Sequence, residues 1–167
     1  GKYSKIHSIH NRTVPIHKAF TLKIRYNDKL IPYKNKALVV SLDDKGQQIN
    51  EGGKLEGKYM TCSIKNFGRY TIAIDTVAPK CKPQNFVSGK ALKAKEKKII
   101  VKISDNLSGV SSYNAYLNGQ WILAEYDGKS GRLIMDAKKL KQGTNKLTIK
   151  LSDSKSNSAS FDYTITK

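Results

Sequence analysis

The chain has 167 residues, a length that fits one ordinary domain or two small ones. Its 31 lysine and arginine residues outnumber 13 acidic residues, which gives a net charge of +18, and 38% of the residues are apolar. These values exclude a disordered chain, and no apolar run approaches the roughly 18 residues of a transmembrane segment. The first residues also lack the apolar core of a secretion signal.

In the first half of the chain, alternating apolar and polar residues predict β-strands. The predicted strands cover residues 20–26, 37–42, 58–64 and 70–74, with glycine-containing turns between them. Residues 1–19 hold at most one irregular edge strand, with Ile6 and Ile9 as its buried side chains. So few strands leave a sandwich incomplete. Either Ile6 and Ile9 supply the missing strand, or the first module is truncated because a longer protein precedes Gly1.

A proline-marked stretch separates this region from the second half. Pro79 and Pro83 lie within five residues of each other. Proline has no backbone donor and does not fit inside a central strand. Residues 75–83 are therefore predicted to form a short, stiff linker, and the expected domains are residues 1–78 and 79–167.

The second half repeats the strand pattern at the spacing of a β-sandwich. The predicted strands cover residues 99–103, 113–117, 121–126, 133–135, 147–151 and 161–165. Asn118 and Gly119 predict a tight hairpin turn, because both residues tolerate positive φ. Asp136 can cap one helical turn over residues 136–140, and other helix signals are nearly absent. The predicted fold class is all-β, with two tandem sandwich modules.

Residue types that carry catalysis or bind metals are scarce. The three histidines, His7, His10 and His17, lie near the N-terminus, far from Cys62 and Cys81, and no zinc-ligand spacing is present. No nucleophile elbow or phosphate-binding loop occurs. We therefore expect no enzymatic activity, no metal and no cofactor. Cys62 shares one strand face with Met60 and Ile64 and should be buried, although a Cys62–Cys81 disulfide is the alternative.

The positive charge has two interpretations. The densest cluster includes Lys93, Lys95, Lys97 and Lys98, which could form a face that binds anions or glycans. Lysines also keep modules soluble and protect exposed strand edges, and this second interpretation is favoured. Only four of the 31 basic residues are arginine, which disfavours nucleic acid as a partner.

Two aromatic residues are the first candidates for stacking on sugar rings, namely Trp121 and Tyr126. They lie on opposite faces of the strand predicted at residues 121–126, and both faces are partly apolar. A buried tryptophan is favoured, since a sandwich needs large apolar side chains in its interior.

Several motifs resemble immunoglobulin-like modules of bacterial surface proteins. They are D-T-V-A-P at residues 75–79, D-N-L-S-G-V at 105–110, L-N-G at 117–119, G-T-N-K-L at 143–147 and D-S-K-S-N at 153–157. In the last motif Ser156 stands where the family pattern has glycine. Over nearly the whole chain, residues 14–17, 41–46, 67–71 and 121–127 resemble the C-terminal modules of lysostaphin-like zinc endopeptidases, which cut peptidoglycan in the bacterial envelope.

This resemblance covers only the non-catalytic part of that family. The family's zinc ligands come from H-x-x-x-D and H-x-H segments, but Asn11 stands four residues after His7 and Val14 stands four after His10. The resemblance implies a non-catalytic spacer or docking tail of an exported peptidase, located in the periplasm or cell envelope. Its implied partners are envelope polysaccharide and its own catalytic domain. The alternative is a stand-alone module that binds polyanions or glycans through its lysine-rich face.

Overall fold

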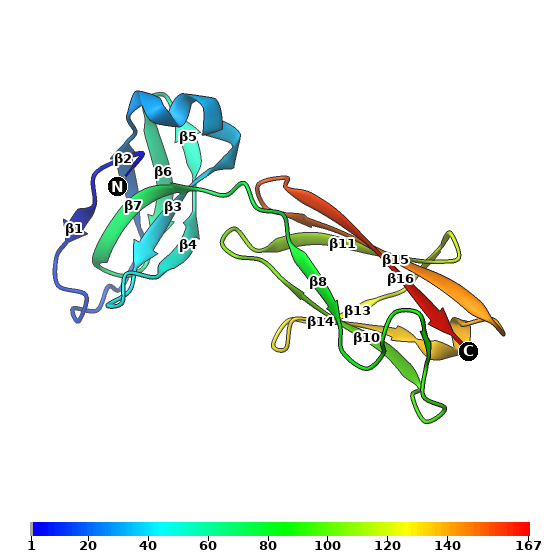
Figure 1. Ribbon diagram of the computed structural model, residues 1–167. Coiled ribbons are helices and arrows are strands. Elements are labelled where there is room, and N and C mark those ends of the chain that lie inside the picture. The colour runs from blue at the N-terminus through cyan, green and yellow to red at the C-terminus, as the bar shows by residue number, and fades with distance from the viewer. Residues whose placement is uncertain (1) are drawn as a thin grey trace. The chain divides into compact units, whose positions relative to one another are not determined.

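The computed structural model describes residues 2–167, which fold into two compact units. The first unit ends at Thr76, and the second comprises Val77–Lys167. This division falls two residues before the boundary expected after residue 78. Each unit contains two β-sheets that enclose a hydrophobic core, which confirms the predicted all-β sandwich class (Figure 1).

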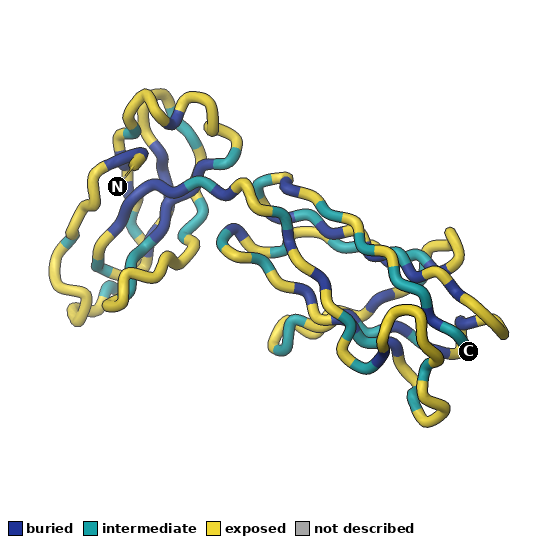
Figure 2. The backbone as a smooth tube through the Cα atoms, viewed as in Figure 1, coloured by how far each residue is buried: buried dark blue, intermediate teal, exposed yellow. Residues whose placement is uncertain are grey.

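The first unit has a four-stranded sheet and a three-stranded sheet. The four-stranded sheet has the order β1 (His7–Ile9), β7 (Gly68–Ile74), β3 (Ala37–Leu42) and β4 (Gln48–Gly52). The other sheet has the order β2 (Phe20–Arg25), β6 (Tyr59–Ile64) and β5 (Lys54–Glu56). Inward-facing side chains of both sheets form the core, and Ile24, Met60 and Tyr70 are each only 1% exposed. Exposed residues are concentrated in the loops (Figure 2).

The strands predicted from alternation in this unit are confirmed as β2, β3, β6 and β7. The N-terminal segment supplies an edge strand, because β1 pairs with β7. Ile9 packs against the core, but Ile6 is 49% exposed, so the predicted burial of Ile6 is wrong. The sequence did not indicate β4 and β5, which are mostly polar and lie at sheet edges with little apolar alternation.

The first unit also contains a 3₁₀ segment, η1 (Asp28–Lys36), in a region where no helix was predicted. The side chain of Asn27 caps it by accepting a hydrogen bond from the amide of Lys29. Leu30 is fully buried and attaches the segment to the core. The sequence gives no helix signal here, because only Leu30 of this polar segment is buried and no apolar stripe is present. Pro32 inside the segment also argues against a regular helix.

The second unit packs a four-stranded sheet against a five-stranded sheet. The first has the order β13 (Glu125–Asp127), β14 (Arg132–Asp136), β10 (Lys98–Ser104) and β8 (Lys80–Pro83). The second has the order β12 (Gln120–Ile122), β11 (Val110–Leu117), β15 (Thr144–Asp153), β16 (Ser158–Thr166) and β9 (Lys90–Ala91). Pairs are antiparallel except β16 and β9, which are parallel. Ile99, Leu133 and Ile149 are fully buried between the sheets.

Most local predictions in the second unit are confirmed. Asn118 and Gly119 have φ values of +52° and +82°, as the hairpin requires. Asp136 caps the short 3₁₀ helix η2 (Ala137–Lys139) by accepting the amide of Lys138. The predicted linker is partly wrong, because Lys80–Pro83 forms edge strand β8. Proline is tolerated there because an edge strand has backbone groups without a neighbour.

The strand predicted over residues 121–126 is wrong in one important respect. The structure divides this stretch into β12 and β13, which belong to different sheets. Leu123 and Ala124 form the crossover between them, and Ala124 is buried against the core. Where a segment passes from one sheet to the other, the side of the segment that faces the core changes partway along its length. Both of its faces are therefore partly apolar, and one regular strand does not account for the pattern.

A buried asparagine closes the loop between η2 and β15. Asn145 is 0% exposed, and its amide nitrogen donates to the carbonyls of Lys141 and Gly143 at 2.8 and 3.0 Å. Its Oδ1 accepts from the amide of Lys141 and from Nδ2 of Asn118, both at 2.9 Å. One side chain thereby joins a loop to the hairpin turn, which explains an asparagine at an inward position of a strand.

The two cysteines are buried and do not form a disulfide, so the Cys62–Cys81 alternative is wrong. Cys62 lies at an inward position of β6, as the alternation predicted. Burial raises the pKa of the Cys62 thiol to about 11, and burial also raises the pKa of Cys81. Both thiols are therefore protonated at neutral pH and have the character of small apolar side chains.

Candidate functional site

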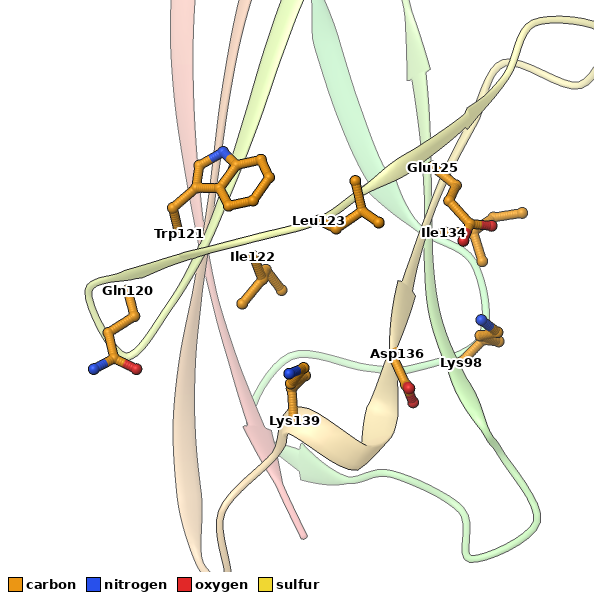
Figure 3. Close-up of a pocket in the computed structure, with 9 residues that line it drawn as sticks. All are labelled: Lys98, Gln120, Trp121, Ile122, Leu123, Glu125, Ile134, Asp136 and Lys139. Atoms are coloured by element: carbon orange, nitrogen blue, oxygen red, sulfur yellow. The ribbon is translucent and has the colours of Figure 1, made fainter.

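The crossover between β12 and β13 borders a surface cavity of about 520 Å³, which we call the edge cavity (Figure 3). Its lining residues are Lys98, Gln120, Trp121, Ile122, Leu123, Glu125, Ile134, Asp136 and Lys139. They come from β12, the crossover, β13, β14, the start of β10 and helix η2. The cavity lies where the chain passes from one sheet to the other, so its rim is built from short strands and a turn.

Two large apolar side chains at this cavity are solvent-exposed. Trp121 is 60% exposed and Leu123 is 64% exposed. The expectation of a buried tryptophan is therefore wrong. Trp121 lies directly opposite Tyr116, whose strand neighbours Ala115 and Leu117 point into the core. The pleat of the sheet consequently directs Trp121 outward.

The exposed tryptophan is held in place by a polar contact. The indole Nε1 of Trp121 donates to Oδ1 of Asn114 at 3.2 Å. Asn114 lies on β11, on the same outward face as Tyr116. This hydrogen bond restricts rotation of the indole ring, so a ligand that stacks on the ring pays a smaller entropy cost.

The charges around the edge cavity are balanced. Lys98 and Lys139 contribute two positive charges, and Glu125 and Asp136 contribute two negative charges. Asp136 uses one carboxylate oxygen to cap η2. An apolar surface bordered by a few donors and acceptors suits a ligand with both apolar faces and many hydroxyl groups, as sugars have.

The titratable groups of the edge cavity are two lysines and two carboxylates. No histidine, cysteine, serine or threonine lines the edge cavity. Among the histidines outside it, His10 lies against the ring of Phe67, with 4.8 Å between ring centroids. Its Nδ1 accepts the amide of Asn11 at 2.7 Å, so this side chain has a local structural role.

The structure brings only some of the sequence-predicted binding residues together. Lys98 and Trp121 line the edge cavity. Tyr126 projects from the other side of β13, where its ring lies 5.6 Å from that of Tyr113. Lys93 lines a different cavity together with Lys90 and Glu96. The remaining predicted residues, Lys95 and Lys97, are exposed and line neither cavity.

Sequence reasoning missed Leu123, Glu125, Asp136 and Lys139 as parts of the site. Asp136 was recognised only as a helix cap. One signal could have indicated the cavity, namely the stretch at residues 121–126 with apolar residues on both faces. Such a pattern is expected where an edge segment leaves one sheet and joins another, and that exchange exposes side chains at the rim.

A comparison with protein families finds a match within the first unit. Residues 1–75 match the model of a family described as the Zu5-like domain, which is less than half of the chain. No curated protein matches the sequence. Within residues 2–167, the structure contains no helix with the length and apolar character needed to cross a bilayer.

Solved structures with some similarity include fibronectin(III)-like modules and a spore cortex lytic enzyme. The fibronectin(III)-like modules of Clostridium thermocellum CbhA align with 97% of this chain and 93% of their own, at 14% identity and a TM-score of 0.38. CopC from Methylosinus trichosporium OB3b aligns with 48% of this chain and 83% of its own, at 16% identity and a TM-score of 0.38. The Clostridium perfringens spore cortex lytic enzyme SleM aligns with 70% of this chain and 37% of its own, at 15% identity and a TM-score of 0.36.

Proposed function

We propose that this chain is a non-catalytic docking arm of an exported cell-wall enzyme, and that its edge cavity holds a sugar unit of envelope polysaccharide. The observation that carries the proposal is the exposed Trp121 beside a cavity with polar and apolar lining. Exposed tryptophans are costly to leave in water, and they are enriched at sites of recognition. The second unit would supply the binding surface and the first would act as a spacer.

The proposed parent enzyme follows from sequence resemblance. The segments at residues 41–46, 67–71 and 121–127 resemble the tails of lysostaphin-like endopeptidases. Residues 121–127 include Trp121, Leu123 and Glu125, so this segment contributes to the rim of the edge cavity. A tail of this kind would hold a peptidase against peptidoglycan in the envelope, which raises the local concentration of its substrate.

The direct test is sedimentation of the full chain with purified peptidoglycan sacculi. Trp121→Ala should weaken binding at least about tenfold, as truncation of a central tryptophan commonly does. Trp121→Phe should retain part of the binding, because it keeps an aromatic face. The matched control is Tyr59→Ala, which removes an aromatic side chain of the first unit that is 43% exposed.

Salt separates this proposal from the polyanion alternative. Stacking is not screened by ions, so binding to sacculi should persist at about 0.5 M NaCl. Loss of binding at that salt concentration would favour the lysines, including Lys93, Lys95, Lys97 and Lys98. Absence of binding by the native chain would refute the docking function itself, and unchanged binding by Trp121→Ala would refute the site.

A further inference from the structure

Three positive side chains stand directly opposite one another on the outer face of the β13-β14-β10-β8 sheet. Strand pairing places Lys102 of β10 between Lys82 of β8 and Arg132 of β14. All three are exposed, and the residues beside them, such as Val101 and Leu133, point into the core. We call these three residues the cationic row. Adjacent strands lie about 4.8 Å apart, so the row spans about 10 Å.

The negative charge on this sheet is confined to β13 and β14, which carry Glu125, Asp127 and Asp136, and the β8 and β10 side of the row has little. Residues 76–104 contain eight lysines and a single acidic residue, Glu96, which accepts a hydrogen bond from Asn85. Among residues 2–167, the ion pairs involve other basic residues and none of the three. At the β13 end of the row, Asp127 stands opposite Arg132. Its pKa is held low mainly by the Ser130 hydroxyl, and Arg132 contributes less.

This arrangement disfavours folding slightly. Like charges directly opposite each other on neighbouring strands repel, and an alternating sheet surface usually pairs opposite charges. Because Lys82, Lys102 and Arg132 form no ion pair, the cationic row is suited to bind an anionic ligand. The neighbouring outward positions on β10 and β14 hold Ile100 and Ile134, which are partly buried. No outward position of β8, β10, β13 or β14 holds an aromatic residue.

We propose that the cationic row binds a linear polyol-phosphate polymer of the cell wall, with successive phosphodiesters against Lys82, Lys102 and Arg132. Lysine contributes a mobile point charge that suits phosphate without demanding a fixed geometry. The four strands of this sheet place no aromatic side chain beside the row, and Trp121 stands on β12 of the other sheet, so base stacking along the row is disfavoured. The three residues of the row are not among those that line the edge cavity, and the cell-wall source of the polymer rests on the proposed function.

The test uses purified poly(glycerol phosphate), which has no sugar rings, and measures its binding to the full chain by calorimetry at about 50 mM NaCl. The triple variant Lys82→Gln, Lys102→Gln, Arg132→Gln should bind at least about tenfold more weakly. Its slope of log affinity against log salt should also fall by about two. The variant Lys82→Arg, Lys102→Arg, which keeps the charge, should bind normally.

The control removes the same charge from exposed sites in the first unit, with Lys18→Gln, Lys29→Gln and Lys58→Gln. This control should retain binding. Equal loss in both triple variants would overturn the proposal, because net charge alone would then explain the affinity. Tighter, row-dependent binding of a single-stranded oligonucleotide or of anionic vesicles would overturn the assignment to a polyol phosphate. Thermal melts should show the row variant at least as stable as the native chain, which excludes misfolding as the cause.

Discussion

Replacing Asn145 with alanine should destabilise the second unit by about 3 kcal/mol. The amide of Asn145 makes hydrogen bonds to both backbone groups of Lys141, to the carbonyl of Gly143 and to the side chain of Asn118. Alanine removes these bonds at a position that is 0% exposed, so water cannot replace them without opening the loop. A typical bond contributes about 0.5–1.5 kcal/mol net, and each orphaned buried group adds to the loss.

The measurement is urea denaturation followed by far-ultraviolet circular dichroism, with hydrogen exchange of β15 and β16 to confirm that the second unit is affected. The control is Asn106→Ala at an exposed position, which should change the free energy of unfolding by less than about 0.5 kcal/mol. Combining Asn145→Ala with Asn118→Ala should give a smaller loss than the sum of the single variants, because they share a bond. A loss below about 1 kcal/mol would refute the reasoning.

Three further predictions concern single residues. Ser156 has a φ of +59°, so Ser156→Gly should stabilise the second unit by about 1 kcal/mol in urea denaturation, and a loss of stability would contradict this. Lys102→Thr should raise stability by about 0.5 kcal/mol at low salt, and the gain should vanish in concentrated salt. The pKa of Cys62 is raised to about 11, so iodoacetamide at pH 8 should alkylate the native thiol far more slowly than the unfolded one by mass spectrometry.

Regular strands could be predicted because one face of each is buried. Alternation located β2 and β6 in the first unit and β10 and β15 in the second. Edge strands such as β4 bury little, so their sequence carries little apolar signal. Segment η1 is held mainly by one leucine and an asparagine cap, which no periodic pattern records.

The candidate site was less accessible to sequence reasoning, because it depends on strand pairing. Trp121 and Lys98 were singled out, but their meeting at one cavity requires the crossover at Leu123 and Ala124. The cationic row likewise depends on the register that places Lys102 opposite Arg132. These two residues are thirty positions apart in sequence, and only turn lengths and core packing set that register.

The crossover separates residues that line the edge cavity from residues that form the core. Ala124 is its buried anchor, whereas Trp121 and Leu123 project into solvent and support little of the core. Insertions or exchanges between β12 and β13 would therefore change the lining of the edge cavity while the other seven strands of the second unit remain intact. Under the proposed function, this short stretch is the place to engineer a new specificity.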